Sequence, residues 1–97
     1  MSAFAPLSQR VLAEKRCSVG WQIREVRKSR RMTQQDVADR LGWTRTSLVA
    51  IERGQQAVTL DQLLNLAELF EVFTSRFFVH LEPFRAPPCR NCGHREW

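Results

Sequence analysis

The residues whose types and spacing could hold a metal ion lie near the C-terminus, where Cys89 and Cys92 stand three positions apart and His94 follows after a glycine. Two thiolates at this spacing can bind one zinc ion, and the glycine permits a tight turn. A structural zinc site takes four ligands, so the remainder would come from Cys17, from His80 or from a second subunit. The stretch therefore predicts half of a zinc site, a reactive dithiol or inert reduced thiols.

A second group of residues could contact a nucleic acid. The apolar spacing predicts a short helix over 45–53 whose inner side carries Leu48 and Ile51. Its other side is open and carries Arg45, Thr46, Val49, Ala50 and Arg53. Arginine can make two hydrogen bonds to O6 and N7 of guanine, and hydroxyl and methyl groups can contact other base edges. The helix thus has a face left over for a partner.

The neighbouring residues predict the structure that positions this helix. Thr33 and Thr44 are good N-caps, and Gly42 supplies the left-handed residue that ends a first helix over 34–41. Gly54 ends the second helix. Two short helices joined by a three-residue turn form a helix-turn-helix.

Four helix starts share one local pattern, the hydrophobic staple, in which an apolar residue before the cap packs on another five positions later. The expected pairs are Met32 with Val37, Trp43 with Leu48, Val58 with Leu63, and Phe73 with Phe78. Gln62 after Thr59 completes a capping box, and Asp36 after Thr33 approximates one.

The remaining helices are expected to close the core around the helix-turn-helix. One should span 18–30 and turn Val19, Ile23 and Val26 inward, and a last one should begin after Thr74. A helix over 60–70 is predicted to bury Leu60, Leu63, Leu64, Ala67 and Phe70. The predicted fold class is all-α, a compact bundle of four to five helices with a cysteine-containing C-terminal tail.

This pattern divides the chain into three parts. Residues 1–17 form an N-terminal arm or an extra helix, 18–82 form the helical domain, and 83–97 form the Cys/His tail. The end of the domain carries more aromatic surface than a small bundle can bury. These residues are interpreted as a contact between two copies of the chain: Phe73, Phe77, Phe78 and Leu81.

The charge of the 97-residue chain is positive and unevenly distributed. The net formal charge is +5, and residues 1–58 hold eleven Lys/Arg against five Asp/Glu. A polyanion is therefore the expected partner, although basic composition also suits a membrane surface. The sequence has no apolar run of about 20 residues that could span a bilayer and no pattern of a signal peptide. We expect a cytoplasmic protein with reduced cysteines.

From about Val19 to Leu81 the chain resembles the lambda-repressor/Cro type of helix-turn-helix regulators, also called the xenobiotic-response-element type. The resemblance rests on Arg27, on Ala38, and on short runs at 32–34, 41–42, 44–47, 51–54 and 58–60. It implies a lambda-repressor-like helical bundle, a recognition helix in the major groove of an operator, and a homodimer that is usually a repressor. The run RTSLVAIERGQQAVTLDQL is also similar to the controller proteins of restriction-modification systems.

The resemblance implies roles for individual residues. Arg45, Thr46, Val49 and Ala50 would read bases, because the first turns of a recognition helix reach base edges. Contacts to the DNA backbone would come from Gln34, Thr44, Lys28, Arg53 and Gln55. Arg27 and Glu52 would form a partly buried structural ion pair between two helices, as the matching residues do in this family.

A different interpretation remains open for the C-terminal part of the chain. The aromatic surface or the cysteine tail could bind a protein partner, as in an antitoxin or adaptor, with DNA binding secondary or lost. An enzyme is not expected, because no nucleophile is paired with a base and no glycine loop that cradles phosphate occurs. The operator, the regulated gene and any effector cannot be read from the sequence.

Overall fold

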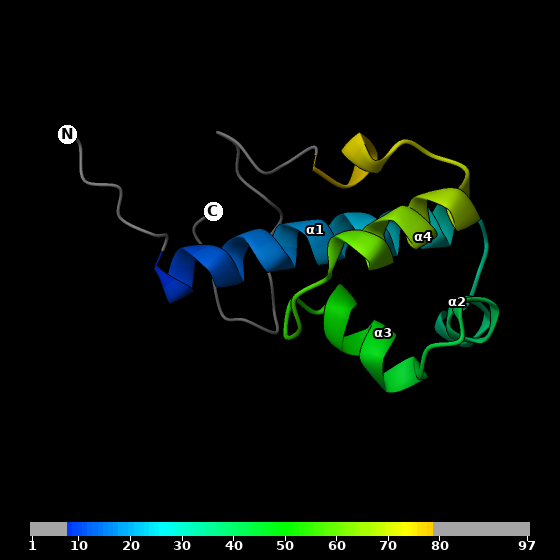
Figure 1. The fold of residues 1–97 in the computed structure, drawn as a ribbon, viewed down its shortest axis with the longest axis horizontal. Coiled ribbons are helices and arrows are strands. Elements are labelled where there is room, and N and C mark those ends of the chain that lie inside the picture. Colours follow the sequence, from blue (N-terminus) through cyan, green and yellow to red (C-terminus); the bar gives the residue numbers. More distant parts are fainter. Residues whose placement is uncertain (1–7, 79–97) are drawn as a thin grey trace.

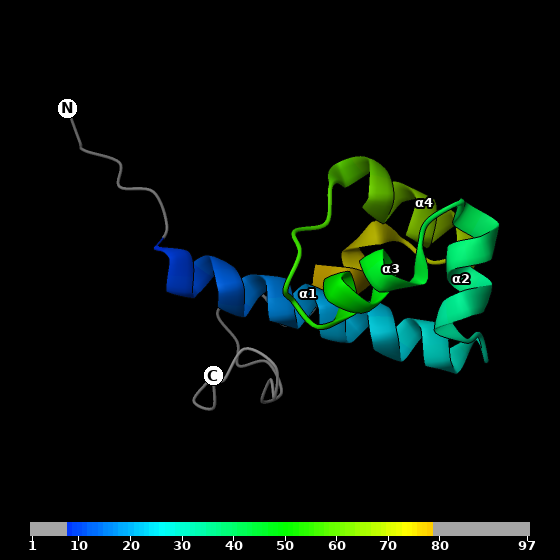
Figure 2. The same ribbon diagram turned by 90° about the horizontal axis from the view of Figure 1, so that it is seen from below.

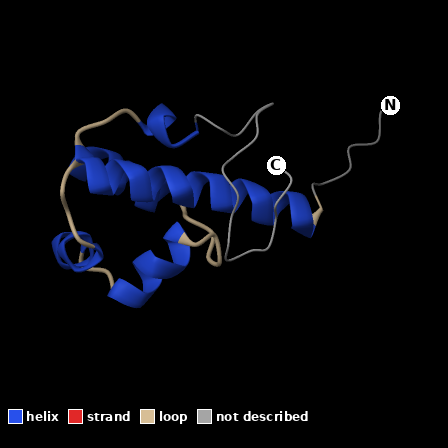
Figure 3. Ribbon diagram, turned by 180° about the vertical axis from the view of Figure 1, so that it is seen from behind, coloured by secondary structure: helices blue, strands red, loops and turns tan. Residues whose placement is uncertain are grey.

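The computed structural model describes residues 8–78, and this part of the chain consists of helices joined by short connections (Figures 1 and 3). The elements are α1 (Gln9–Ser29), α2 (Gln34–Leu41), α3 (Arg45–Glu52), α4 (Leu60–Phe70) and a short 3-10 helix, η1 (Thr74–Phe78). The expected all-helical bundle of four to five helices is confirmed. The cysteine-containing tail lies outside the described residues.

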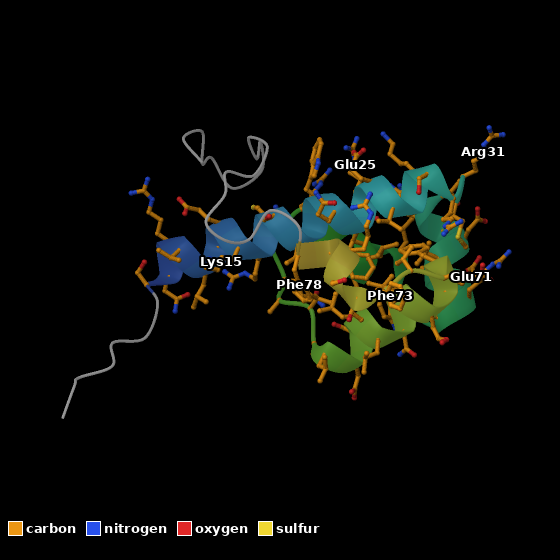
Figure 4. All side chains as sticks on the ribbon, turned by 90° about the horizontal axis from the view of Figure 1, so that it is seen from above. Lys15, Glu25, Arg31, Glu71, Phe73 and Phe78 are labelled. Atoms are coloured by element: carbon orange, nitrogen blue, oxygen red, sulfur yellow. The ribbon has the colours of Figure 1, made fainter. Side chains whose placement is uncertain are left out.

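The first helix is longer than expected. We predicted a start at Ser18, whereas α1 begins at Gln9, with the Ser8 hydroxyl accepting a hydrogen bond from the Val11 amide at 3.2 Å. Residues 9–17 contain no proline or glycine and are rich in strong helix formers, so the helix continues through them. This half of α1, which carries Lys15, extends beyond the other helices (Figures 1, 2 and 4).

The local signals of the helix-turn-helix are confirmed. The hydroxyls of Thr33, Thr44 and Thr59 accept backbone N–H groups three residues on, at 3.0 to 3.1 Å. Capping boxes form at Thr33 with Asp36 and at Thr59 with Gln62, so the approximate box at Asp36 is complete. Gly42 takes the left-handed conformation (φ 73°) that ends α2.

The core lies where α1 meets α3, α4 and η1. It contains Val19, Ile23 and Val26 of α1 as expected, together with Leu48 and Ile51 of α3. Three of the staple residues that precede the caps pack against it: Met32, Trp43 and Val58. Leu48 and Ile51 thus anchor the inner side of α3 in the core.

Two glycines allow α1 to approach the end of α3 closely. A Cβ atom on Gly20 would lie 2.4 Å from the carbonyl oxygen of Ile51, and one on Gly54 would lie 2.5 Å from the sulfur of Cys17. Gly54 also has a positive φ of 76°. Both positions therefore accept only glycine without displacement of the backbone.

The predicted inner face of α4 is partly wrong. Leu63, Ala67 and Phe70 are buried as expected, but Leu60 and Leu64 are 69% and 49% exposed, and Leu66 is buried in their place. A helix with leucines on most sides has several candidate stripes, and the packing angle against the core selects one.

The last element also differs from the prediction. Thr74 lies inside η1 rather than capping an α-helix, and Phe73 is 86% exposed, so the fourth staple, Phe73 with Phe78, does not form. Phe77 is fully buried in the core instead. The guanidinium of Arg76 donates a hydrogen bond of 2.6 Å to the side-chain carbonyl of Gln22, which ties η1 to α1.

Candidate nucleic-acid interface

The first turn of α3 is exposed on the side of the bundle that faces away from η1 (Figures 1 and 2). Leu48 and Ile51 are buried beneath α3, whereas Arg45 and Thr46 are exposed and Val49 and Ala50 are half-buried. The four residues expected to read bases therefore share the outer side of one helix. No described part of the chain covers the Arg45 end of this face.

A buried ion pair fixes α3 to α1. Nε of Arg27 donates to one carboxylate oxygen of Glu52 at 2.7 Å, and a terminal nitrogen donates to the other oxygen at 3.2 Å. The side chains of Arg27 and Glu52 are only 9% and 2% exposed. The second terminal nitrogen of Arg27 donates to the carbonyl of Met32 at 2.7 Å. The structure thus contains the ion pair that the family resemblance implies.

Gln34 lies between this ion pair and the exposed end of α3. Its amide nitrogen donates to Glu52 Oε1 at 3.0 Å, and its carbonyl accepts a hydrogen bond from Arg45 at 3.4 Å. The spacing of the sequence did not predict either contact. Arg45 therefore has a partner within the chain.

An open basic groove of about 640 Å³ adjoins Arg45. The groove is lined by the last turns of α1 and the start of α2, and by five basic side chains: Arg24, Arg27, Lys28, Arg31 and Arg45. No acidic residue lines it. Backbone N–H groups at a helix N-terminus and nearby cations together favour an anion such as phosphate.

Sequence reasoning named Lys28 as a backbone contact and did not assign Arg24 a role. Arg24 precedes Lys28 by four residues, which places both on one face of α1, and this spacing could have identified it. Its guanidinium lies 5.1 Å from the ring centroid of Trp21 and 3.4 Å from a carboxylate oxygen of Glu25. The partly exposed ring of Trp21 thus contacts a cation of the groove.

Asp36 is the acidic residue in the first turn of α2, and it is committed to the helix cap. Hydrogen bonds from the backbone and then the hydroxyl of Thr33 hold the pKa of Asp36 below its usual value. The cap therefore stabilises the start of α2 at neutral pH, and the contribution is lost as the pH falls through the lowered pKa.

The other expected backbone contacts lie around α3. Thr44 is its N-cap, Arg53 is its exposed C-cap, and Gln55 lies exposed in the following connection. The carbonyl of Arg53 also accepts a 3.6 Å hydrogen bond from the sulfur of Cys17. Thr44 and Arg53 lie at opposite ends of α3, which suits contacts to the DNA backbone on the two sides of one DNA groove.

The predicted aromatic contact between two copies of the chain is wrong at Phe77. Phe77 cannot contribute to it, because its side chain is fully buried between α1 and α4. Phe73, just before η1, and Phe78, the last residue of η1, remain exposed on the far side of the bundle from α3 (Figures 1 and 4). Leu81 lies outside the described residues.

The expected metal ligands Cys89, Cys92 and His94, like His80, also lie outside the described residues. Cys17 is buried. Across residues 8–78, no three His, Cys, Asp or Glu side chains gather in a way that could hold a metal ion. Within the same range, no helix is both long and apolar enough to cross a membrane.

A family model described as helix-turn-helix matches residues 23–72, and no match was found among curated proteins. The chain is 28% identical to an HTH_3 family transcriptional regulator from Vibrio cholerae, with a TM-score of 0.64; the match covers 69% of this chain and only 38% of that one. It is also 28% identical to the restriction-modification controller protein C.AhdI from Aeromonas hydrophila, with a TM-score of 0.62 over 65% of this chain and 96% of that one. A hypothetical transcription factor from Neisseria shares the fold at 20% identity, with a TM-score of 0.62 over 89% and 90% of the two chains.

Proposed function

This chain belongs to the helix-turn-helix family of DNA-binding transcriptional regulators, and we propose that it binds one specific operator sequence as a homodimeric repressor. The observation that supports the proposal most is the exposed first turn of α3 beside a groove with four basic side chains that are not buried: Arg24, Lys28, Arg31 and Arg45. A helix held in this way can enter the major groove while the basic side chains contact phosphates.

We assign the contacts by position. Arg45 would make the bidentate contact to a guanine, Thr46 would bond a base edge or touch a thymine methyl group, and Val49 and Ala50 would line an apolar contact. Phosphates on either side would meet Lys28 and Thr44 at one end of α3 and Arg53 and Gln55 at the other. In a dimer, the two half-sites should lie about 10 base pairs, or ~34 Å, apart.

Replacing Arg45 by alanine should remove the preference for one or two base pairs of the operator. A good bidentate arginine contact is worth about 1–3 kcal/mol of discrimination, which is roughly 5- to 150-fold in relative affinity. The measurement is a selection of bound sequences from random duplexes, followed by titration of the selected operator and its single-base variants.

Lys28→Ala is the matched control, since it removes a cation from the groove and leaves the reading face intact. It should weaken binding to all sequences alike and reduce the slope of log affinity against log salt by about one. An Arg45→Ala protein that kept the wild-type base preference would show that the reading face is assigned wrongly.

The second copy is proposed to contact two exposed aromatic residues, Phe73 just before η1 and Phe78 at its end. Phe73→Asp should convert a dimer into a monomer at micromolar concentration and lower operator affinity at least tenfold, because a charge would replace apolar contact area. Sedimentation equilibrium with and without operator measures both effects. Asn65→Asp, which adds the same charge at an exposed position of α4, is the control.

A wild-type protein that is monomeric at high concentration would contradict the homodimer. The exposed Phe73 would then favour the other interpretation, in which this surface binds a different protein. Repression itself is tested by a reporter promoter that carries the selected operator: transcription should fall when the chain is expressed and recover with Arg45→Ala.

A further inference from the structure

The four α-helices of the described part of the chain end in a similar way, with a residue in the left-handed conformation. These residues are Arg31 after α1, Gly42 after α2, Gly54 after α3 and Glu71 after α4. In each case the amide of the following residue donates to the carbonyl five residues before it, at 2.9 to 3.2 Å. This hydrogen bond is characteristic of the Schellman motif, whose left-handed position favours glycine. Two of the four positions hold a charged residue instead.

The left-handed conformation is strained at Arg31, because a Cβ atom makes it unfavourable whereas glycine adopts it freely. Space does not explain the choice, since at Gly42 a Cβ atom would meet nothing within 4 Å and the position still holds glycine. The turn at Arg31 is held by its own amide, which donates to the Lys28 carbonyl at 2.9 Å, and by the bond from the Arg27 side chain to the Met32 carbonyl at 2.7 Å. Strain that is held in place by surrounding contacts points to a use for the side chain.

The surroundings of Arg31 add an electrostatic cost. Its side chain is exposed, lines the basic groove and projects from the end of α1 (Figure 4). Lys28 lies three residues before it, a spacing at which like charges repel. Among residues 8–78, no carboxylate forms an ion pair with Arg31. Thr33, the N-cap of α2, follows two residues later, and a helix N-terminus favours an anion. A bound anion would offset these costs.

We propose that Arg31 is a ligand of a DNA phosphate, and that the chain keeps it at the left-handed position at the expense of stability. The planar guanidinium can donate two hydrogen bonds to one phosphate. The inference rests on the proposed function and adds a contact to those assigned above. A phosphate contact carries no sequence information, so Arg31 strengthens binding to every duplex alike.

The test is Arg31→Gly, which removes the cation and relieves the backbone. Its melting temperature should rise by roughly 2–5 °C, because glycine adopts the left-handed conformation without strain. Its affinity for a mixed-sequence duplex should fall about three- to tenfold, and the slope of log affinity against log salt should fall by about one. Thermal unfolding followed by circular dichroism and fluorescence anisotropy titrations over a series of salt concentrations measure these effects.

Two control variants separate the backbone from the charge. Glu71→Gly relieves the same conformation at the end of α4, outside the basic groove, so it should raise the melting temperature and leave the salt slope unchanged. Arg30→Ala removes an exposed cation next to Arg31 that does not line the groove, and it should also leave the slope unchanged. Arg31→Lys keeps the charge and should retain most of the slope.

The possible results distinguish this role from the proposed function. An unchanged salt slope in Arg31→Gly, or an equal loss of slope in Arg30→Ala, would overturn the phosphate contact. A lower melting temperature in Arg31→Gly would show that Arg31 stabilises the end of α1, and would overturn the cost in stability. A wild-type protein that binds every duplex alike would overturn the specific operator, whereas the slope comparison at Arg31 would still hold.

Discussion

The variant Arg27→Ala should lower the free energy of unfolding by about 3–5 kcal/mol, because it leaves the carboxylate of Glu52 buried without its main partner. The side chain of Glu52 is 2% exposed, and Arg27 supplies two of the hydrogen bonds it accepts, at 2.7 and 3.2 Å. The loss extends to the Met32 carbonyl, which accepts from Arg27 at 2.7 Å. Gln34 alone cannot neutralise the remaining charge.

Thermal unfolding followed by circular dichroism measures this effect. For a domain of this size the melting temperature should fall by roughly 15–30 °C. Lys28→Ala, one residue further along α1 and exposed, should change stability by less than about 0.5 kcal/mol.

The double variant Arg27→Met/Glu52→Met separates charge burial from packing. It should be more stable than Arg27→Ala, since two apolar side chains carry no buried charge. The double variant should still be less stable than the wild-type protein, because the Met32 carbonyl loses its hydrogen-bond donor in both variants. A double variant as unstable as Arg27→Ala would mean that the buried charge of Glu52 is not the main cause of the lost stability, and that the packing of the two side chains is.

The second large effect is expected at Phe77. Phe77→Ala should cost about 3–5 kcal/mol of stability, because the ring is fully buried and its removal leaves a cavity in the core. Phe78→Ala, at the neighbouring residue, which is 40% exposed, should cost clearly less. Urea unfolding of both variants gives the comparison directly.

Protein concentration decides between burial in the core and contact with a second copy. Loss of a core residue lowers the stability of a single chain by the same amount at every concentration, whereas loss of a dimer contact changes it mainly where the dimer forms. Phe77→Ala should show the first behaviour and Phe73→Asp the second. Equal, concentration-dependent effects at both positions would contradict the placement of Phe77 in the core.

The helix boundaries around the proposed reading face could be predicted from the sequence because their signals are local. Thr33, Thr44 and Thr59 accept backbone groups only three residues away, and Gly42 ends α2 through its own backbone conformation. The outward side of α3 could also be predicted, because Leu48 and Ile51 share one side of the helix and their burial turns the opposite side outward. The start of α1 could not, because residues 9–17 have helix-forming composition but no strong apolar stripe.

Only the tertiary structure decided which of several equivalent residues turned inward. Leu66 was buried in preference to Leu60 and Leu64, and Phe77 in preference to Phe73, because packing against α1 selects one stripe and the sequence offers several. The contacts of Gln34 belong to the same class. Glu52 and Arg45 lie eighteen and eleven positions from it, so no local spacing brings them together. Local hydrogen bonds thus determined where each helix begins and ends, while long-range packing determined which side chains meet.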